Sequence, residues 1–548
     1  MKKLICRIFV FLAALGLAAC ADDTMSESPR CLDSLDCPSD KMCDIPTGRC
    51  VPIPNPEAVV DFELTPIKGS GTAETQIPSK DLASLINISD VELELESAVR
   101  VWGKVFSPEA MGGVPGNLMI DRLPEIDNRR LVWNITVNEN GEFESTEVTP
   151  GEHDVLFKPS NRADFPQMEI AGIEIAPDAD GEMDLTLALA YEPFDNQEKL
   201  RLVRGQVLQS QSSPHPVTGI EVEGITDQGL RTSLVTPDEE GYFDLRLPMR
   251  RTVETNGDLI ECQPQSLDIT IRPVGDRRLP TVEVQAVELE GPDLGVFYIG
   301  DEPTPYSISG TVTDMGGNPI PECRMRFEAD NIGNGTYSHE IKSGSDGKFS
   351  TILPEGTYKI TVIPPLLSEI RMETVTWVLF QNESDVIIML KNRYRLTGEV
   401  TDSTGAKVAD VIVRAKRLST VSGVEDGVVR TYEGITGDNG TFDLAVDSGR
   451  YNVYFIPTAA SGLPRQLPKR VYIADDDEHL SVSLPSPAVV QGHIFDQFGE
   501  PQCDVTVDVY SSTETNAYLV GQTISDSPDD GCTGAYTVII PAKLVDED

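Results

Sequence analysis

The fold is decided by the stretch Ser343–Pro365, which reads SGSDGKFSTILPEGTYKITVIPP. In its second half, apolar Tyr358, Ile360 and Val362 alternate with polar residues, as in a strand with one buried and one solvent-facing side. Asp-Gly before the first strand and Pro-Glu-Gly before the second supply residues that tolerate tight turns. The stretch therefore predicts two short antiparallel strands joined by a turn.

Versions of this phrase occur five times, each downstream of a strand signal of the form Gly-x-Val or Gly-x-Ile. The signal glycines are Gly103, Gly205, Gly310, Gly398 and Gly492, and the aromatics that follow the turns are Phe143, Phe243, Phe349, Phe442 and Tyr536. The glycines are 88 to 105 residues apart, about the length of one compact domain. Short strands with Gly, Pro, Asn and Asp turns predict an all-β chain of tandem antiparallel β-sandwiches, arranged in a rod.

The third copy carries the clearest family resemblance. SGTVTDMGGNPIPECRMRF, beginning at Ser309, together with SDGKFSTILPEGTYKITV resembles the carboxypeptidase regulatory-like domain. That family has a transthyretin-like sandwich, which also falls among the carbohydrate-binding-like folds. The resemblance weakens through the fourth, fifth, second and first copies and covers about residues 95 to 548. It implies an accessory or surface module, and it carries over no catalytic residue.

The N-terminus predicts export and a lipid anchor. Basic Lys2, Lys3 and Arg7 precede a short apolar run, as in a secretory signal peptide. The sequence LAAC that ends at Cys20 resembles the lipobox of bacterial lipoproteins, which implies cleavage before Cys20 and its lipidation, palmitate included. Inner and outer membrane are not distinguished by the sequence, and we favour the outer membrane or cell surface of a Gram-negative bacterium.

The other cysteines predict disulfides. Cys31, Cys37, Cys43 and Cys50 lie in a short polar segment of an exported chain, which favours two disulfides of undetermined connectivity over zinc. The segment resembles the cysteine-rich stalks of bacterial surface lipoproteins. Cys503 and Cys532 share the fifth repeat and are expected to pair. A bond between Cys262 and Cys323, across the second and third repeats, is the weaker expectation.

These signals divide the chain into eight parts. They are the signal peptide 1–19, the anchor and stalk 20–56, a linker or leading strand 57–94, and sandwiches at 95–195, 196–290, 291–393, 394–486 and 487–548. The last sandwich is expected to be incomplete, because one or two strands of the third repeat have no counterpart after Pro541. Either the chain is truncated, or another segment such as Val59–Pro66 supplies what is missing, since an unpaired edge invites strand addition.

Composition and motifs argue against several functions. With 89 Asp and Glu against 44 Lys and Arg, a formal charge of −45, the chain is expected not to bind nucleic acid. None of the five histidines begins a zinc-peptidase motif, and neither a nucleophile elbow nor a phosphate loop is present, so no enzyme and no cofactor are predicted. Asp178, Asp180 and Asp184 are weak calcium candidates in DADGEMD, without the glutamate that completes an EF-hand.

The sequence thus favours an exported, lipid-anchored scaffold or interaction protein, with a glycan-binding adhesin as the alternative. Its expected partners are the membrane, through the lipid, and cell-surface proteins or polysaccharide. Glycan binding needs exposed aromatic rings, and Trp102, Trp133 and Trp377 all lie in apolar strand contexts that favour core packing. The glycan-binding alternative therefore rests mainly on analogy with the carbohydrate-binding-like fold.

Overall fold

The structure is a computed structural model of the chain. It describes residues 41–44, 49–52, 59–82, 90–107, 112–126, 129–145, 147–178, 181–188, 201–253, 259–275, 278–418, 428–513 and 516–542. The chain divides into two compact units, Met1–Pro54 and Asn55–Asp548. In the first unit, β1 (Lys41–Asp44) pairs with β2 (Arg49–Pro52) in a hairpin whose register places the Cα atoms of Cys43 and Cys50 opposite each other. Cys20, Cys31 and Cys37 lie outside the described residues.

The second unit confirms the predicted fold class. Its described residues form strands and loops, and their only helical segments are the short 3₁₀ turns Ala459–Ser461 and Pro528–Asp530. Among the described residues, we found no helix long and apolar enough to cross a membrane. The strands form β-sandwiches, each around a core of its own. Most neighbouring strands are antiparallel, but the small sheet of every sandwich also contains a parallel pair, so the expectation of antiparallel sheets is only partly confirmed.

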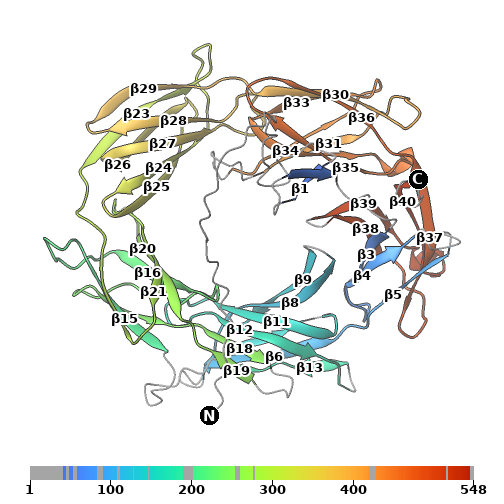
Figure 1. Cartoon of the computed structure of the whole chain (residues 1–548), viewed down its shortest axis with the longest axis horizontal. Helices are drawn as coiled ribbons and strands as arrows, with labels where there is room; N and C mark the ends of the chain where they lie inside the picture. The colour runs from blue at the N-terminus through green and yellow to red at the C-terminus, as the bar shows by residue number, and fades with distance from the viewer. Residues whose placement is uncertain are drawn as a thin grey trace, which may run out of the picture. The chain divides into compact units, whose positions relative to one another are not determined.

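The third sandwich shows the repeating unit most plainly (Figure 1). Its small sheet has the order β26-β23-β29 and its large sheet the order β25-β24-β27-β28. Tyr358, Ile360 and Val362, the alternating residues of the deciding stretch, are at most 1% exposed in the core. The strands are β23 (Pro305–Thr313), β24 (Arg324–Ile332), β25 (Gly335–Lys342), β26 (Lys348–Pro354), β27 (Gly356–Ile363), β28 (Glu373–Leu379) and β29 (Glu383–Met389).

The fourth and second sandwiches repeat this plan. In the fourth, β33-β30-β36 faces β32-β31-β34-β35; in the second, β17-β15-β22 faces β16-β20-β21. The fourth comprises β30 (Tyr394–Thr401), β31 (Ile412–Arg417), β32 (Thr431–Ile435), β33 (Thr441–Val446), β34 (Gly449–Ile456), β35 (Gln466–Ile473) and β36 (Glu478–Ser483). The second comprises β15 (Leu202–Leu208), β16 (Ile220–Thr226), β17 (Tyr242–Arg246), β20 (Ser266–Pro273), β21 (Val282–Glu288) and β22 (Asp293–Tyr298).

The first sandwich borrows strands from the second repeat. Its large sheet has the order β19-β18-β12-β11-β8-β9, in which β18 (Met249–Val253) pairs in parallel with β12, and β19 (Leu259–Cys262) extends the sheet. The buried side chain of Met249 joins the first core. The remaining strands are β6 (Arg100–Ser107), β7 (Gly112–Gly113), β8 (Gly116–Ile126), β9 (Arg129–Val137), β10 (Glu142–Glu144), β11 (Gly151–Pro159), β12 (Met168–Ile175), β13 (Glu182–Asp184) and β14 (Leu187–Ala188).

Two features of the second repeat differ from the boundaries expected from sequence. The hairpin β18–β19 lies within 196–290 but adds to the sheet of the first sandwich. Conversely, β22 lies beyond residue 290, yet it pairs with β15 and belongs to the second sandwich. A strand belongs to the sheet in which it pairs, and the spacing of the repeats does not show which distant segments will pair.

The repeated glycine and aromatic are cross-strand neighbours in all five sandwiches. Gly310 lies opposite Phe349, and the other four pairs have the same register. A Cβ on Gly310 would lie 2.0 Å from the carbonyl oxygen of Val386 on β29. Only a residue without a side chain allows the last strand of the repeat to approach so closely.

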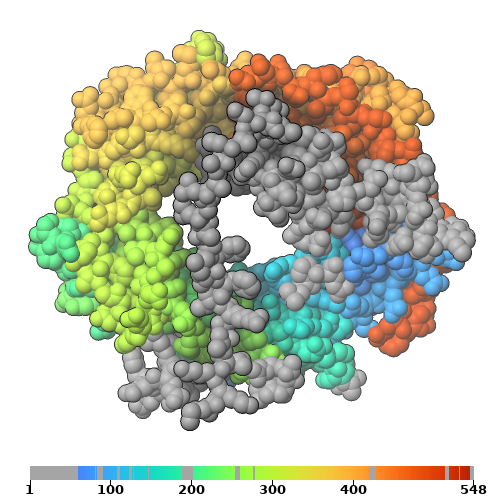
Figure 2. Space-filling model, in the orientation of Figure 1, coloured from blue at the N-terminus to red at the C-terminus, as the bar shows by residue number. Residues whose placement is uncertain are grey.

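The fifth sandwich is completed by the N-terminal part of the second unit. Its small sheet has the order β40-β37-β5 and its large sheet β39-β38-β3-β4 (Figure 1). The C-terminal strands are β37 (Pro487–Asp496), β38 (Thr506–Thr513), β39 (Asn516–Ile524) and β40 (Ala535–Pro541), and the N-terminal ones are β3 (Val59–Thr65), β4 (Thr75–Asp81) and β5 (Val91–Leu95). In Figure 2 the blue atoms of the N-terminal strands lie against the orange-red atoms of the C-terminal ones.

The fifth sandwich is therefore not truncated: another segment of the chain completes it, which was the second of the two alternatives. Three strands are supplied, where one or two were expected, and they occupy much of the region 57–94 that was expected to be a linker or leading strand. Val60, Phe62 and Leu64 from β3 share one core with Val507 and Val509 of β38. The sequence DVELEL at 90–95 has the alternation of DVIIML at 385–390, so β5 takes the place that β29 has in the third sandwich.

The first and fifth sandwiches meet at an acidic junction. Arg129 of β9 donates from Nε to Oε2 of Glu63, 2.8 Å away, and its guanidinium lies 4.2 Å from the ring centroid of Tyr510. Burial, together with the charge of Glu63, raises the pKa of the Glu74 carboxyl. Burial likewise raises the pKa of Asp508. Three carboxyl groups thus share this junction with Arg129.

Replacing Glu74 with glutamine is expected to stabilise this junction at neutral pH. Because the folded-state pKa of Glu74 is raised above its ordinary value of 4.5, the folded chain binds this proton more tightly than the unfolded chain. The stability that the residue contributes is therefore greatest below pH 4.5 and falls as pH rises through the raised pKa. Hydrogen exchange of β3 and β4 at pH 5 and pH 7.5 measures the effect.

The matched control is Glu92→Gln, at an exposed position of β5 in the same sandwich. Glu74→Gln should increase protection at pH 7.5 more than at pH 5, whereas Glu92→Gln should have little effect at either. Lower protection of Glu74→Gln at pH 7.5 would contradict the expectation.

A buried ionic network joins the third and fourth sandwiches. Asp447 is fully buried and forms ion pairs with Arg430, at 3.1 Å, and with Arg393, at 3.5 Å. Its carboxylate also accepts hydrogen bonds from the Tyr432 hydroxyl and from the backbone N–H of Met372. Burial, followed by the charge of Asp447, raises the pKa of Tyr432 to about 12. Both arginines also donate to backbone carbonyls of the segment after β27, at residues 364–366.

Candidate functional site

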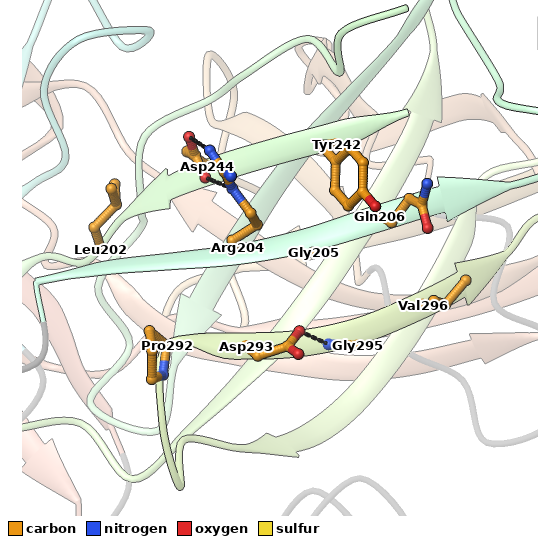
Figure 3. A pocket seen from close by; sticks show the side chains of 10 residues that line it. All are labelled: Leu202, Arg204, Gly205, Gln206, Tyr242, Asp244, Pro292, Asp293, Gly295 and Val296. Atoms are coloured by element: carbon orange, nitrogen blue, oxygen red, sulfur yellow. Dashed lines mark hydrogen bonds and ion pairs between the residues drawn. The ribbon is translucent and has the colours of Figure 1, made fainter. Parts of the chain in front are cut away.

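A shallow groove lies on the outer face of the small sheet of the second sandwich (Figure 3). It has a volume of about 580 Å³. On β15, Val203, Gly205 and Val207 face the core, so Arg204 and Gln206 point outward into the groove by strand alternation. A register shift in β22 beside Gly295, whose φ is +79°, interrupts the alternation of the third strand.

Strand register arranges the lining side chains in two rows. In the first row, Gln206 lies between Tyr242 of β17 and Val296 of β22. Tyr242 is 42% exposed and Val296 is 45% exposed, so ring and aliphatic side chain both face solvent. This row therefore presents an apolar surface on either side of an amide.

The second row is charged. Arg204 lies between Asp244 of β17 and Asp293 of β22. Its guanidinium donates two hydrogen bonds to Asp244, at 2.7 and 2.8 Å, which Figure 3 shows as dashed lines. The hydrogen bond from Arg204 lowers the pKa of Asp244, and the same bond raises the pKa of Arg204. The pair is therefore ionised across the physiological range, and its two charges offset each other.

Two polar groups keep acceptor capacity toward the groove. The Gln206 side-chain amide donates to the backbone carbonyl of Glu240 at 2.9 Å, which orients its Oε1 as an acceptor. Asp293 accepts from the backbone N–H of Gly295 through Oδ1, at 2.8 Å. The other carboxylate oxygen of Asp293 adds a second acceptor at the opposite edge.

The groove's aromatic is specific to the second sandwich. Tyr242 lies opposite the residue after the repeat glycine, and this position carries a different residue in every other repeat: Glu142, Lys348, Thr441 and Ala535. The sequence holds the signal, since only the second turn, DEEGYF, places an aromatic directly before the repeat aromatic. A comparison that treats the five repeats as equivalent does not reveal it.

The cysteine predictions have different outcomes. Cys503 and Cys532 form a disulfide, as predicted. Cys262 and Cys323 are not joined, and the expected bond between them is wrong. Cys323 is fully buried in the third core, where its thiol donates to the Ile320 carbonyl, whereas Cys262 lies on β19 in the sheet of the first sandwich. Burial raises the pKa of the Cys323 thiol to about 11, so it is a structural residue.

Among the described residues, one group of side chains has the spacing of a metal site: Cys503, Asp526 and Cys532. Its two sulfur atoms are bonded to each other, so they offer no thiolate ligand. The calcium candidates show turn chemistry instead. Asp178 accepts from the backbone N–H of Glu182, and Asp184 accepts from the Thr186 hydroxyl. Asp180 lies outside the described residues.

The tryptophans are only in part core residues. Trp133 and Trp377 pack against the first and third cores, as expected. Trp102 is 44% exposed on the outer face of β6, where it lies between Glu144 and Asp184. The expectation of core packing is wrong for Trp102 because the repeat glycine beside it, Gly103, faces the core and alternation sends the tryptophan outward.

Comparison with known proteins leaves the family open. No family model and no curated protein matches the chain, so membership of the carboxypeptidase regulatory-like family stays a prediction. Among solved structures, the chain is similar to a streptococcal ancillary pilin, with 12% identity over 52% of this chain and 98% of that one and a TM-score of 0.21. The Bacillus anthracis TIE protein gives 16% identity over 68% of each chain and a TM-score of 0.17.

The minor pilin GBS52 of Streptococcus agalactiae gives 13% identity over 33% of this chain and 98% of that one, with a TM-score of 0.22. TM-scores and identities this low are insufficient to transfer a function. The functional conclusion has to come from the chain's own residues.

Proposed function

We propose that this chain is an exported, lipid-anchored and non-catalytic surface protein whose tandem sandwiches form a scaffold for interaction. The completed fifth sandwich is the observation that carries the proposal. Its strand β3 lies in the interior of a sheet, between β38 and β4, so the segment that follows the stalk is held on both sides. A terminal segment that is hydrogen-bonded within a sheet resists fraying and proteolysis. A scaffold outside the cell needs this resistance.

The charged clusters support the same role. Asp447 with its two arginines connects the third and fourth sandwiches, and Glu63 with Arg129 connects the fifth and first. Arg162, from the first repeat, pairs with Glu223 of β16, whose side chain is 6% exposed. Titratable groups are thus used to hold neighbouring sandwiches together.

A second function, adhesion to glycans, is favoured by the groove of the second sandwich. The groove combines the exposed Tyr242 ring with the amide of Gln206 and the carboxylate of Asp293. Aromatic surface beside a few placed polar groups is the usual composition of a small-ligand site. The two functions are compatible, since a scaffold can carry one adhesive sandwich.

Cys20→Ala is expected to release the protein from the membrane, because the substitution removes the thiol that would carry the lipid. Detergent-phase partitioning measures the release, and protease treatment of intact cells measures surface exposure of the parent chain. Cys6→Ala is the matched control, since Cys6 belongs to the part that cleavage removes. Membrane partitioning unchanged by Cys20→Ala would contradict lipid anchoring, and protection of the parent chain from protease would contradict surface display.

A further inference from the structure

We propose that the groove between Tyr242 and Asp293 binds an uncharged saccharide, with Tyr242 as its stacking surface. The proposal rests on the adhesive function proposed above and names the class of ligand. It makes the second sandwich, of the five, the one that recognises glycans.

The apolar part of recognition comes from the first row. A pyranose ring has apolar C–H faces and a polar rim of hydroxyl groups. A tyrosine side chain likewise combines an apolar ring face with a polar hydroxyl group. Tyr242 is exposed and lies on β17 beside Gln206, with Val296 on the far side of the amide. A sugar ring placed over Tyr242 therefore removes apolar surface from water on both partners.

The polar part is made of acceptors, which suits hydroxyl donors. The amide N–H of Gln206 is already used by the Glu240 carbonyl, which leaves Oε1 to accept. The Asp293 carboxylate keeps acceptor capacity beyond its bond to Gly295. Hydroxyl groups on the rim of a sugar can donate to both, whereas a ligand with only acceptors cannot.

Charge decides against an acidic ligand. The bidentate pair of Arg204 with Asp244 uses the guanidinium fork that would otherwise bind a carboxylate or phosphate. Asp293 then leaves the groove with one net negative charge, in a chain whose formal charge is −45. A uronic acid, sialic acid or phosphate would be repelled.

The groove also needs little rearrangement to bind. Apart from Pro292, its lining residues lie on three paired strands, and Arg204 and Gln206 are already held by hydrogen bonds. Sites on paired strands lose less conformational entropy on binding than sites on loops.

The test is affinity electrophoresis of the full chain, in non-ionic detergent, through gels containing single polysaccharides. Dextran, mannan, xyloglucan and a mixed-linkage β-glucan are the neutral probes, and alginate and polygalacturonate are the acidic ones. We expect retardation by at least one neutral probe. Tyr242→Ala should weaken the apparent affinity at least tenfold, and Tyr242→Phe, which keeps the ring, should retain most of it.

Two controls are matched to Tyr242. Tyr472→Ala removes a tyrosine that is 60% exposed in the fourth sandwich, and Trp102→Ala removes the exposed tryptophan of the first. Both should leave the retardation unchanged. Equal loss with either control variant, or unchanged retardation of Tyr242→Ala, would overturn the assignment to this groove.

The panel also separates this inference from the function on which it rests. Retardation by acidic probes alone would overturn the uncharged ligand and leave adhesion standing. Retardation by no probe in the panel would overturn both. Surface display is measured separately by protease treatment of cells.

Discussion

Gly492→Val is expected to detach β5 and open the fifth sandwich. A Cβ at Gly492 would lie 1.8 Å from the carbonyl oxygen of Val91 and 2.6 Å from its carbonyl carbon, so β5 has to move away from β37. Val91, Leu93 and Leu95 are at most 2% exposed, and burying each contributes about 1.5 to 3 kcal/mol. Displacement of β5 should therefore destabilise this sandwich by at least about 4 kcal/mol, a large fraction of a typical domain's stability.

Hydrogen exchange followed by peptide is the appropriate measurement, because a chain of several domains does not unfold in one step. Peptides from residues 59–95 and 487–541 should lose protection in Gly492→Val, while those of the third sandwich keep theirs. Gly291→Val is the matched control, since a Cβ at Gly291 meets no atom within 4 Å. Full protection of residues 59–95 in Gly492→Val would show that β5 is not held by β37.

A second variant tests the same contact from the other side. Leu93→Ala removes buried side-chain atoms of β5 from the fifth core and leaves the sequence of β37 unchanged. Such truncations typically lower the free energy of unfolding by about 2 to 5 kcal/mol. It should therefore reduce protection of the C-terminal peptides as well. Protection lost only in residues 59–95 would contradict a shared core.

Asp447→Asn is expected to destabilise the contact between the third and fourth sandwiches by about 3 to 5 kcal/mol. The substitution removes the charge that offsets Arg393 and Arg430, whose side chains are 3% and 10% exposed. Removing one partner of a buried ion pair lowers stability by more than the pair itself contributes to it, because an unpaired charge is left in a poorly solvated site. Peptides around Pro364–Met372 and around Asp447 should exchange faster.

Asp443→Asn provides a matched control in the same sandwich. Asp443 is 53% exposed and pairs with Arg395, whose side chain is 37% exposed. Solvent-exposed pairs of this kind are typically worth about 1 kcal/mol or less. Equal effects of the two substitutions would contradict the view that burial of the Asp447 network makes it structural.

Most of the candidate groove was not predicted from the sequence, although each of its residues is visible there. Tyr242 precedes the repeat aromatic Phe243, and its neighbour Gln206 follows the repeat glycine, so both positions belong to the repeat. What sequence spacing does not report is that Asp293 and Val296, about 50 residues further on, pair beside them. The register shift next to Gly295 decides which of their neighbours face outward, and it depends on the partner strand.

The sequence by itself determined the sandwich class and the local strands. Alternation in stretches such as 358–362, the repeat glycines and the Asp/Asn-Gly turns are short-range properties, because side-chain period and turn geometry depend on a few adjacent residues. The disulfide between Cys503 and Cys532 was also predicted, because the two cysteines lie within one repeat, 29 residues apart. Only the tertiary structure decided that β3, β4 and β5 complete the fifth sandwich, that β18 and β19 join the first, and that Cys262 and Cys323 lie in different sheets. These outcomes depend on which apolar faces and backbone edges remain unpaired when the whole chain has folded. A segment such as Val59–Thr65 can cover such a face and pair with such an edge although it lies about 450 residues from its partner strand in the sequence.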